Sequence, residues 1–358
     1  MIQCLHIVKN THTECAAICH VVAGLSKGLA PLGYRTSVVF LSGEGPLLGH
    51  FRAAGVDAYA CAWTGTASDL RGAGAFFLLA RALRPDIVHV HHGGLSVRLP
   101  ARLCGGAVVQ HVHSPILENT GERLCATRFR GAHAVIATSR AVASCVRAAK
   151  LEVIYPGVVV GSSPEPLQPK DYMLIGAAAR LVPLKGLADL ISALSRLRTR
   201  GINARLQIAG EGPEEQRLRT HAQECGVLQE VEFLGWRSDL SRIRAAWDVA
   251  VVPSLEEGFG LSALEAMAIG RAVVASRVGG LAELIEDGVS GLLVAPEDAD
   301  ALAAALFRLA GQRERLASMG AAAWQRARCY FSAERMAEAT HGLYQRVLFP
   351  AKALAPVC

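Results

Sequence analysis

The sequence of 358 residues has no apolar run of the roughly 20 residues that a membrane-spanning helix needs. The most apolar candidate, residues 70–85, is interrupted by Arg81 and Arg84. The first residues also lack the charged start and long apolar run of a signal peptide. These absences predict a cytoplasmic protein.

The ten cysteines include no Cys-x-x-Cys pair, so nothing in their spacing indicates a structural zinc site. In a reducing compartment they are interpreted as small buried apolar residues rather than as a disulfide framework. Cys15 and Cys19 lie near His12 and His20 at helical spacing, which is an alternative arrangement for a metal. A secluded pair of thiols is the commoner structure for such spacing.

Charged residues make up only 19% of the chain and hydrophobic residues 51%, a composition that predicts large buried cores. The length favours two domains. The net charge of +6 is uneven, because residues 1–165 carry 15 Lys and Arg against 9 Asp and Glu, whereas residues 166–358 carry 22 of each. The basic first half is compatible with an anionic membrane surface, with a phosphorylated substrate, or simply with a basic solvated face.

Short apolar runs alternate with longer amphipathic runs along the chain, which is typical of strand–helix units and parallel sheets. Residues 156–171 interrupt this alternation with four prolines and indicate a linker. The pattern therefore predicts two doubly wound halves, in which ligands bind at the C-terminal edges of the strands, in a cleft between the halves. The predicted strands are 3–8, 36–41, 86–91, 107–113 and 134–138 in the first half, and 173–179, 205–210, 231–235, 249–254, 271–276 and 291–295 in the second.

Two cations follow the first strand of the second half, in the stretch AARLVPLKG. Arg180 and Lys185 stand between that strand and a predicted helix, where they could grip a diphosphate. Taken alone, such a pair is more often two solvated surface charges.

The stretch SLEEGFGLSALEAM places Glu257 on a glycine loop and Glu265 near the start of the next helix. A second glycine loop, GEGPEE, follows the strand 205–210. Free N–H groups at a helix start favour phosphate, whereas carboxylates would repel it and suit sugar hydroxyls. A ligand with a central diphosphate and hydroxyl-rich ends fits both kinds of group, and a nucleotide sugar has this chemistry.

Residues 254–294 resemble the signature region of family four of the retaining glycosyltransferases, which share the GT-B fold. Similar sequences also occur, in the family's order, at AARLVPLKG, IAGEGPEEQRL, VEFLGW and VVPS. The resemblance covers nearly all of residues 172–300 and is looser in the first half, where it rests on DIVHVH, QHVHS and VIATSRAV. It implies an α/β protein of GT-B type, with two Rossmann-like domains facing across a cleft. We expect an acceptor-side domain at 1–160 that regains a helix at about 332–350, a linker at 161–171 and a donor-side domain at 172–331.

The resemblance also implies roles for individual residues. Catalytic roles fall to His113, which faces the donor sugar, with His111 as the alternative, and to Glu257, which contacts the sugar hydroxyls. The other donor-binding residues implied are Arg180 and Lys185 for the diphosphate, Glu265 for the ribose, and Gly258, Phe259, Gly260 and Leu261, whose backbone approaches the sugar and phosphates. The implied reaction is front-face transfer with retention from a UDP- or GDP-linked sugar to an acceptor hydroxyl, without metal or other cofactor.

Five histidines stand at the ends of two predicted strands: His89, His91, His92, His111 and His113. Zinc is an alternative for this group, but spacing within strands and the lack of Cys or Asp partners favour one histidine near a sugar and the rest structural. Asp298 and Asp300 resemble a metal-binding acidic pair. They open an apolar periodic stretch, so a helix N-cap explains them.

Three positions depart from the family pattern. The loop after the first strand has no glycine until Gly24, so Thr11 or Thr13 hydroxyls and helix N–H groups would have to replace its phosphate contact. Arg271 stands where the family has proline, and the linker begins Pro156–Gly157–Val158–Val159.

Two rival functions are weighed against transfer. GFGLSA fits a dinucleotide fingerprint with Arg277 as reader of a 2′-phosphate, which would suit an NADP-dependent oxidoreductase, but four residues separate strand and glycine. A non-catalytic nucleotide-sugar-binding protein of the same fold is the other rival. The basic first half fits a lipid-linked or phosphorylated acceptor and peripheral association with the inner face of the cell membrane. The expected process is the synthesis of a cell-surface glycan, a glycolipid or a polysaccharide. Nothing in the sequence indicates nucleic acid.

Overall fold

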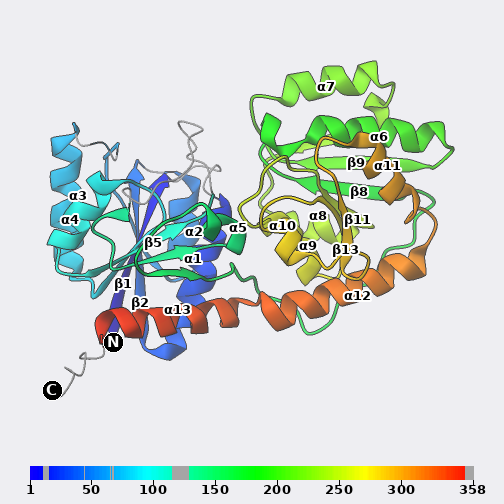
Figure 1. The fold of residues 1–358 in the computed structure, drawn as a ribbon. Helices are drawn as coiled ribbons and strands as arrows, with labels where there is room; N and C mark the ends of the chain where they lie inside the picture. The colour runs from blue at the N-terminus through cyan, green and yellow to red at the C-terminus, as the bar shows by residue number, and fades with distance from the viewer. Residues whose placement is uncertain (11–15, 44, 65, 67, 115–128, 351–358) are drawn as a thin grey trace. The chain divides into compact units, whose positions relative to one another are not determined.

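The computed structural model describes residues 1–10, 16–43, 45–64, 66, 68–114 and 129–350. The chain forms two compact units (Figure 1). Unit 1 comprises Met1–Gly157 together with Ala333–Cys358, and unit 2 comprises Val158–Ser332. The sequence predicted a first domain at 1–160, a linker at 161–171 and a second domain at 172–331. In the structure the linker residues belong to unit 2, and the last boundary lies one residue later.

Unit 1 contains a seven-stranded parallel sheet in the order β3-β2-β1-β4-β5-β6-β7. Its central strands are mostly buried and apolar, as expected for a parallel sheet with helices on both faces. The seven strands are β1 (Ile2–Asn10), β2 (Tyr34–Ser42), β3 (Asp57–Ala60), β4 (Ile87–Val90), β5 (Ala107–Val112), β6 (Ala134–Ala137) and β7 (Leu151–Val153).

Helices cover the two faces of this sheet in two groups (Figure 1). Helices α3 (Leu70–Leu83) and α4 (Leu95–Leu103) pack on one face, where Phe76, Val97 and Trp63 meet the strand residues Leu5 and Ile7. Helices α1 (Ala16–Leu29) and α2 (Pro46–Ala53) pack on the other face, and α5 (Arg140–Ser144) follows β6.

The last helix, α13 (Ala333–Leu348), belongs to unit 1 although it follows unit 2 in the chain. It packs closely against α1, since a Cβ atom on Gly28 would lie 2.5 Å from Cβ of Ala337. The Tyr34 hydroxyl lies 2.9 Å from Nδ1 of His341, and Tyr344 is fully buried. The glycine of α1 therefore provides the space that lets the distant helix dock.

Unit 2 contains a six-stranded parallel sheet in the order β10-β9-β8-β11-β12-β13. The strands are β8 (Met173–Ala178), β9 (Ala204–Ala209), β10 (Val231–Gly235), β11 (Val249–Val252), β12 (Ala272–Ser276) and β13 (Gly291–Val294). The two sheets confirm the prediction of two doubly wound α/β halves.

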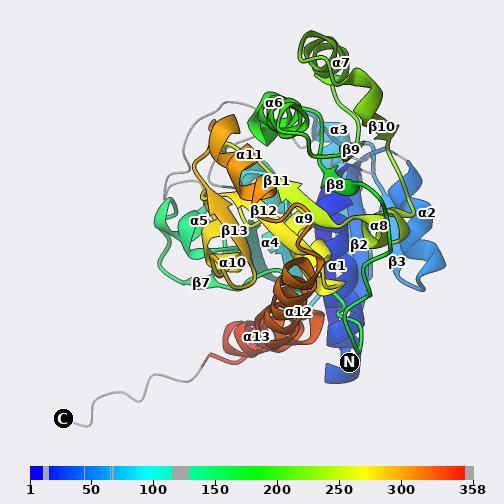
Figure 2. The same ribbon diagram turned by 90° about the vertical axis from the view of Figure 1, so that its right-hand side faces the viewer.

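The helices of unit 2 also lie on both faces of their sheet (Figure 2). Helices α6 (Leu187–Thr199) and α11 (Ala299–Phe307) cover one face, and α7 (Glu215–Glu224) packs beside α6. Helices α9 (Leu261–Ala268) and α12 (Arg313–Tyr330) cover the other face, with the short helices α8 (Leu240–Ala246) and α10 (Leu281–Leu284). The side chain of Asp298 accepts a hydrogen bond from the Ala301 amide at 2.8 Å, which confirms its interpretation as a helix cap.

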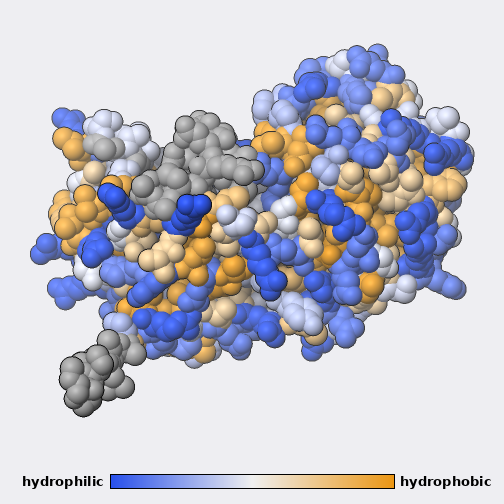
Figure 3. Space-filling view, in the orientation of Figure 1, coloured by the Kyte–Doolittle hydropathy of each residue, from blue (hydrophilic) through white to orange (hydrophobic). Residues whose placement is uncertain are grey.

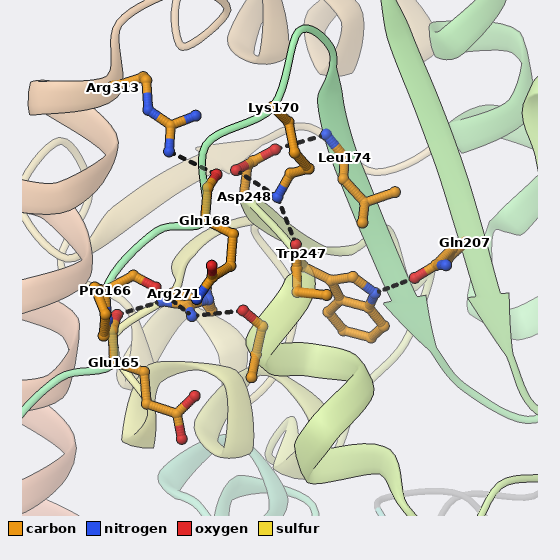
Figure 4. A network of polar contacts seen from close by, with 12 residues as sticks. Glu165, Pro166, Gln168, Lys170, Leu174, Gln207, Trp247, Asp248, Arg271 and Arg313 are labelled. Atoms are coloured by element: carbon orange, nitrogen blue, oxygen red, sulfur yellow. Dashed lines mark hydrogen bonds and ion pairs between the residues drawn. The ribbon is translucent and has the colours of Figure 1, made fainter.

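The proline-rich segment after Gly157 is held to unit 2 by a buried arginine (Figure 4). Arg271 is 1% exposed and donates hydrogen bonds to the backbone carbonyls of Glu165, Pro166 and Ala245 at 2.6, 3.2 and 2.7 Å. A proline at this position could donate none of them. The departure from the family pattern at Arg271 thus has a structural reason.

No helix in the described ranges is both long and apolar enough to cross a membrane.

Trp247 fills the space beside Gly176 of β8, and its indole N–H donates to Oε1 of Gln207 at 3.0 Å (Figure 4). A Cβ atom on Gly176 would overlap the indole ring. We therefore predict that Gly176→Ala lowers the free energy of unfolding of unit 2 by about 2–3 kcal/mol, because overpacking forces the ring off its rotamer.

The measurement is urea denaturation followed by tryptophan fluorescence. Gly161→Ala is the matched control, because its Cβ would meet only the Ser163 carbonyl oxygen at an ordinary 3.6 Å. Equal stability of the two variants would contradict the prediction.

Candidate functional site

Four neighbouring strands of unit 2 deliver their C-terminal loops to one place. The order β9-β8-β11-β12 makes the loops adjacent, and α6 and α9 leave the sheet on opposite faces at β8 and β11. Such a change of face is where doubly wound sheets bind ligands. The residues predicted for the donor lie on the β8 and β11 loops and in α9, the helix that follows the β11 loop.

Glycines let these loops touch through their backbones. A Cβ atom on Gly186 would overlap the Pro253 carbonyl oxygen, and one on Gly279 would overlap that of Glu257. The Leu255 amide donates to the Leu184 carbonyl at 2.9 Å across the first of these contacts. Gly186 and Gly279 also have positive φ values of 61° and 45°, so a side chain at either would be strained as well as crowded.

Lys185 and Glu257 form an ion pair between the β8 loop and the β11 loop. Nζ of Lys185 lies 2.7 Å from Oε2 of Glu257, which also accepts a hydrogen bond from the Ser254 hydroxyl at 3.2 Å. The two side chains are 26% and 18% exposed, so the pair is partly shielded from water. The sequence assigned these residues to different parts of a ligand, and the structure places them in contact.

Arg180 is exposed and lies two residues beyond the end of β8. Its side chain forms no hydrogen bond or ion pair with the described residues, so its guanidinium can meet a ligand without breaking a contact. The cations Arg180 and Lys185 therefore differ in state, because only Lys185 is already paired.

The helix α9 begins immediately after the glycine loop. Gly260 is its N-cap with φ of 105°, and no side chain caps the helix. The Phe259 ring is buried and packs against Phe331 with ring centroids 5.5 Å apart. The Phe259 ring is therefore part of the buried packing of unit 2.

Glu265 lies in α9 and pairs through Oε2 with Nη2 of Arg244 in α8. The side chains are 17% and 7% exposed. Arg244 could not be identified from the sequence, since one arginine in an amphipathic helix carries no signal of a buried partner. The ion pair with Arg244 holds the Glu265 carboxylate in place in α9, the helix that follows the glycine loop.

His113 belongs to unit 1 and ends a connected set of histidines, here called the histidine column: His6, His89, His91, His111 and His113. The column crosses β1, β4 and β5 on the face that α1 and α13 cover. Neighbouring rings stack, with centroids 4.2 Å apart between His111 and His113 and 4.4 Å apart between His89 and His91. The sequence predicted the strand ends but not His6, which stands within β1, or the alignment of the five rings.

His6, His89, His91 and His111 are buried, His113 is partly exposed, and no acidic side chain among the described residues pairs with the column. Burial lowers the pKa of His6 to about 3, and burial together with repulsion between the rings lowers the pKa values of His89, His91, His111 and His113 well below the usual range. The imidazoles are therefore neutral at pH 7. The contacts of Thr11, Thr13, His12 and Cys15 lie outside the described residues.

Two family models match the chain. The model described as "Glycosyltransferase Family 4" matches residues 20–161, and "Glycosyl transferases group 1" matches residues 162–326. A glycogen synthase of Mycobacterium tuberculosis is 30% identical over 293 residues, which cover 74% of this chain and 69% of that protein. An MMP α-(1→4)-mannosyltransferase of Mycolicibacterium hassiacum is 37% identical over 181 residues, which cover 49% of this chain but only 43% of the relative.

The fold is similar to that of HepE of Anabaena, solved in complex with UDP-glucose. The TM-score is 0.83 at 20% sequence identity, over 96% of this chain and 99% of that protein.

The Arg244–Glu265 pair gives a testable consequence for stability. Glu265→Ala leaves a buried guanidinium without its carboxylate, so we predict a loss of about 3 kcal/mol in the free energy of unfolding of unit 2. The double variant Arg244→Met with Glu265→Leu should lose far less, since both charges are removed.

Urea denaturation of Arg244→Met, Glu265→Leu and their double variant measures this coupling, because the two single changes are the ones combined in the double variant. Arg217→Ala is the control, because its pair with Glu214 is 72% exposed on the arginine side and should contribute under about 1 kcal/mol. Additive losses in the double variant would show that the pair is not coupled.

Proposed function

This chain belongs to family four of the glycosyltransferases and has the GT-B fold, and from this premise we propose that it transfers a sugar from a nucleotide-diphosphate sugar to an acceptor hydroxyl with retention of configuration. The observation that carries the proposal is the group of loops after β8, β11 and β12. They bring two cations, two carboxylates and an uncapped helix start to one edge of unit 2.

The diphosphate is the part of the donor that the cations suit. Arg180 can bind phosphate oxygens bidentately, and Lys185 can bind them as a point charge. In the structure Lys185 is paired with Glu257. An incoming diphosphate would compete for the ammonium group and would leave the Glu257 carboxylate to accept hydrogen bonds from the sugar hydroxyls. One ion pair is thereby exchanged for two ligand contacts.

The other donor contacts follow from the same loops. The backbone of Gly258, Phe259, Gly260 and Leu261 would approach the sugar and phosphates at the start of α9, and Glu265 would hold the ribose hydroxyls while keeping Arg244 as its partner. The neighbour that was solved with UDP-glucose supports a UDP-linked donor, and a GDP-linked donor has the same diphosphate chemistry.

In the proposed reaction, negative charge develops on the departing diphosphate. The bond between the anomeric carbon and the phosphate oxygen breaks, and the acceptor oxygen bonds to that carbon on the same face. The leaving phosphate oxygen takes the acceptor's proton, so no protein base is required. Arg180, Lys185 and the N–H groups of α9 stabilise the departing diphosphate, which is why we propose that transfer itself uses no metal. His113 is proposed to face the donor sugar.

The acceptor side of the proposal rests on the outer surface of α3 and α4 in unit 1. Five exposed leucines lie there, and apolar and hydrophilic side chains are interleaved over these helices (Figure 3). Neither helix contains an acidic residue. The leucines are Leu70, Leu78, Leu95, Leu99 and Leu103, and the exposed arginines beside them are Arg71, Arg81, Arg84 and Arg102.

Exposed leucines among arginines suit an anionic membrane surface, since the arginines meet lipid headgroups and the leucines enter the interface. We therefore propose that the enzyme works in the cytoplasm, peripherally on the inner face of the membrane. A lipid-linked or phosphorylated acceptor fits that position, and glycolipid or polysaccharide synthesis is the class of process it would serve.

Thermal stabilisation by UDP, GDP, ADP, dTDP and NADP tests the donor assignment. A nucleoside diphosphate at about 100 times its dissociation constant should add roughly 2.7 kcal/mol to the free energy of unfolding. We predict this shift with one nucleoside diphosphate, its loss in Arg180→Ala, Lys185→Ala and Glu265→Ala, and its retention in Arg217→Ala.

A shift with NADP alone would favour the oxidoreductase. A shift with a nucleoside diphosphate, combined with no transfer or hydrolysis of the corresponding sugars, would favour a non-catalytic binding protein.

Co-sedimentation with vesicles tests the membrane assignment. We predict binding to anionic vesicles at low salt, its loss at high salt because the charges are screened, and weaker binding of the Leu78→Glu and Arg81→Glu variants. Arg217→Glu in unit 2 makes the same change of charge as Arg81→Glu but outside the α3–α4 surface, and it should bind normally. Absence of binding at both salt concentrations would contradict the assignment.

A further inference from the structure

We propose that unit 1 binds a divalent transition-metal ion of the zinc class through His91, His111 and His113. One nitrogen atom from each of these rings lies within 4.8 Å of those of the other two. Imidazole nitrogen is a preferred ligand of zinc. The sequence argued against zinc because of the spacing within each strand, but the parallel register of β4 and β5 aligns ligands from both strands.

One ring nitrogen of His111 has no hydrogen-bond partner among the described residues, which favours a ligand at that atom. His111 is 2% exposed, and its Nε2 has no hydrogen-bond partner among the described residues. A buried imidazole nitrogen without a partner is costly unless something else satisfies it. A metal ion bound at Nε2 would do so.

Hydrogen bonds to other histidines hold two of the three proposed ligand rings in place. Nε2 of His91 lies 2.9 Å from Nδ1 of His6, and Nδ1 of His111 lies 3.1 Å from Nε2 of His89. Histidines that bind metals nearly always donate their other ring N–H to an acceptor, which fixes the tautomer and orients the ring. Two of the three proposed ligands have this arrangement.

Donors and acceptors can be assigned to all the hydrogen bonds around His6 and His89 in a way that is consistent with this orientation of the ligand rings. If His6 accepts at Nδ1, it donates from Nε2 to Sγ of Cys4 at 3.4 Å, and if His89 accepts at Nε2, it donates from Nδ1 to the Tyr344 hydroxyl at 2.5 Å. The Cys4 thiol can then donate to the same hydroxyl oxygen at 3.5 Å. No ring in this path needs a second proton.

Binding would require one proton to move. Nδ1 of His91 lies 3.0 Å from Nε2 of His113, so in the metal-free protein the His113 N–H donates to His91. A metal ion between these atoms replaces that hydrogen bond, and the His113 proton moves to Nδ1. Three nitrogen ligands leave the fourth tetrahedral position for water or an anion.

A second set of three histidines, His6, His89 and His91, has the same proximity but fits a metal less well. Both ring nitrogens of His6 and of His89 already have partners, and all three residues are buried, with no residue more than 4% exposed. His113, in contrast, is partly exposed and offers a route of entry. This difference selects His91, His111 and His113.

The experiment titrates the metal-stripped full chain with Co²⁺ and follows the visible spectrum. Zn²⁺ affinity is then measured by competition with a chromophoric chelator. We expect one equivalent of Co²⁺ to give the absorption of a four-coordinate nitrogen site without a near-ultraviolet thiolate band. His113→Ala and His111→Asn should each weaken Zn²⁺ binding at least about tenfold, whereas the exposed His50→Ala should not.

His113→Ala keeps the test valid if His111→Asn fails to fold, because His113 lies at the open end of the column. A thiolate band, or Zn²⁺ affinity unchanged in His113→Ala, would overturn the proposal and leave a hydrogen-bonded chain of neutral histidines. The readout is metal binding and not transfer, so it is independent of whether the chain is a transferase.

Discussion

The close approach of backbone to backbone at the β8, β11 and β12 loops is the constraint on which the proposed donor site depends. Gly186 and Gly279 permit contacts that any side chain would block. These contacts bring Lys185 within 2.7 Å of Glu257 and place both beside the uncapped start of α9. The chemistry of the site therefore rests on charged groups whose positions are set by glycines.

The sequence predicted most of the fold because both sheets are parallel and buried. Such strands appear as continuous apolar runs, and all eleven predicted strands occur in the structure. The strands β3 and β7 were missed because they are only four and three residues long and lie at the edges of their sheet. Their short mixed sequences resemble loops.

The site was less predictable than the fold, since its partners come from distant parts of the chain. The sequence identified Lys185, Glu257 and Glu265 by residue type and spacing. It could not reveal that Lys185 is paired with Glu257 or that Glu265 is paired with Arg244, because these contacts depend on loop geometry and on the docking of α8 against α9. The same limit applies to the histidine column, whose alignment depends on the register between three strands.

In the proposed donor site, Glu257 holds Lys185 until a diphosphate replaces it. Calorimetry tests this exchange of partners at Lys185. It measures the affinity for the preferred nucleoside diphosphate in the wild-type protein and in Glu257→Gln. Because the neutral amide competes less for the ammonium group, we predict that Glu257→Gln binds the nucleoside diphosphate more tightly than the wild-type protein does. The sugar of the corresponding nucleotide sugar should add less affinity in Glu257→Gln than in the wild-type protein. Weaker binding of the nucleoside diphosphate by Glu257→Gln would show that Glu257 does not compete with the diphosphate for Lys185.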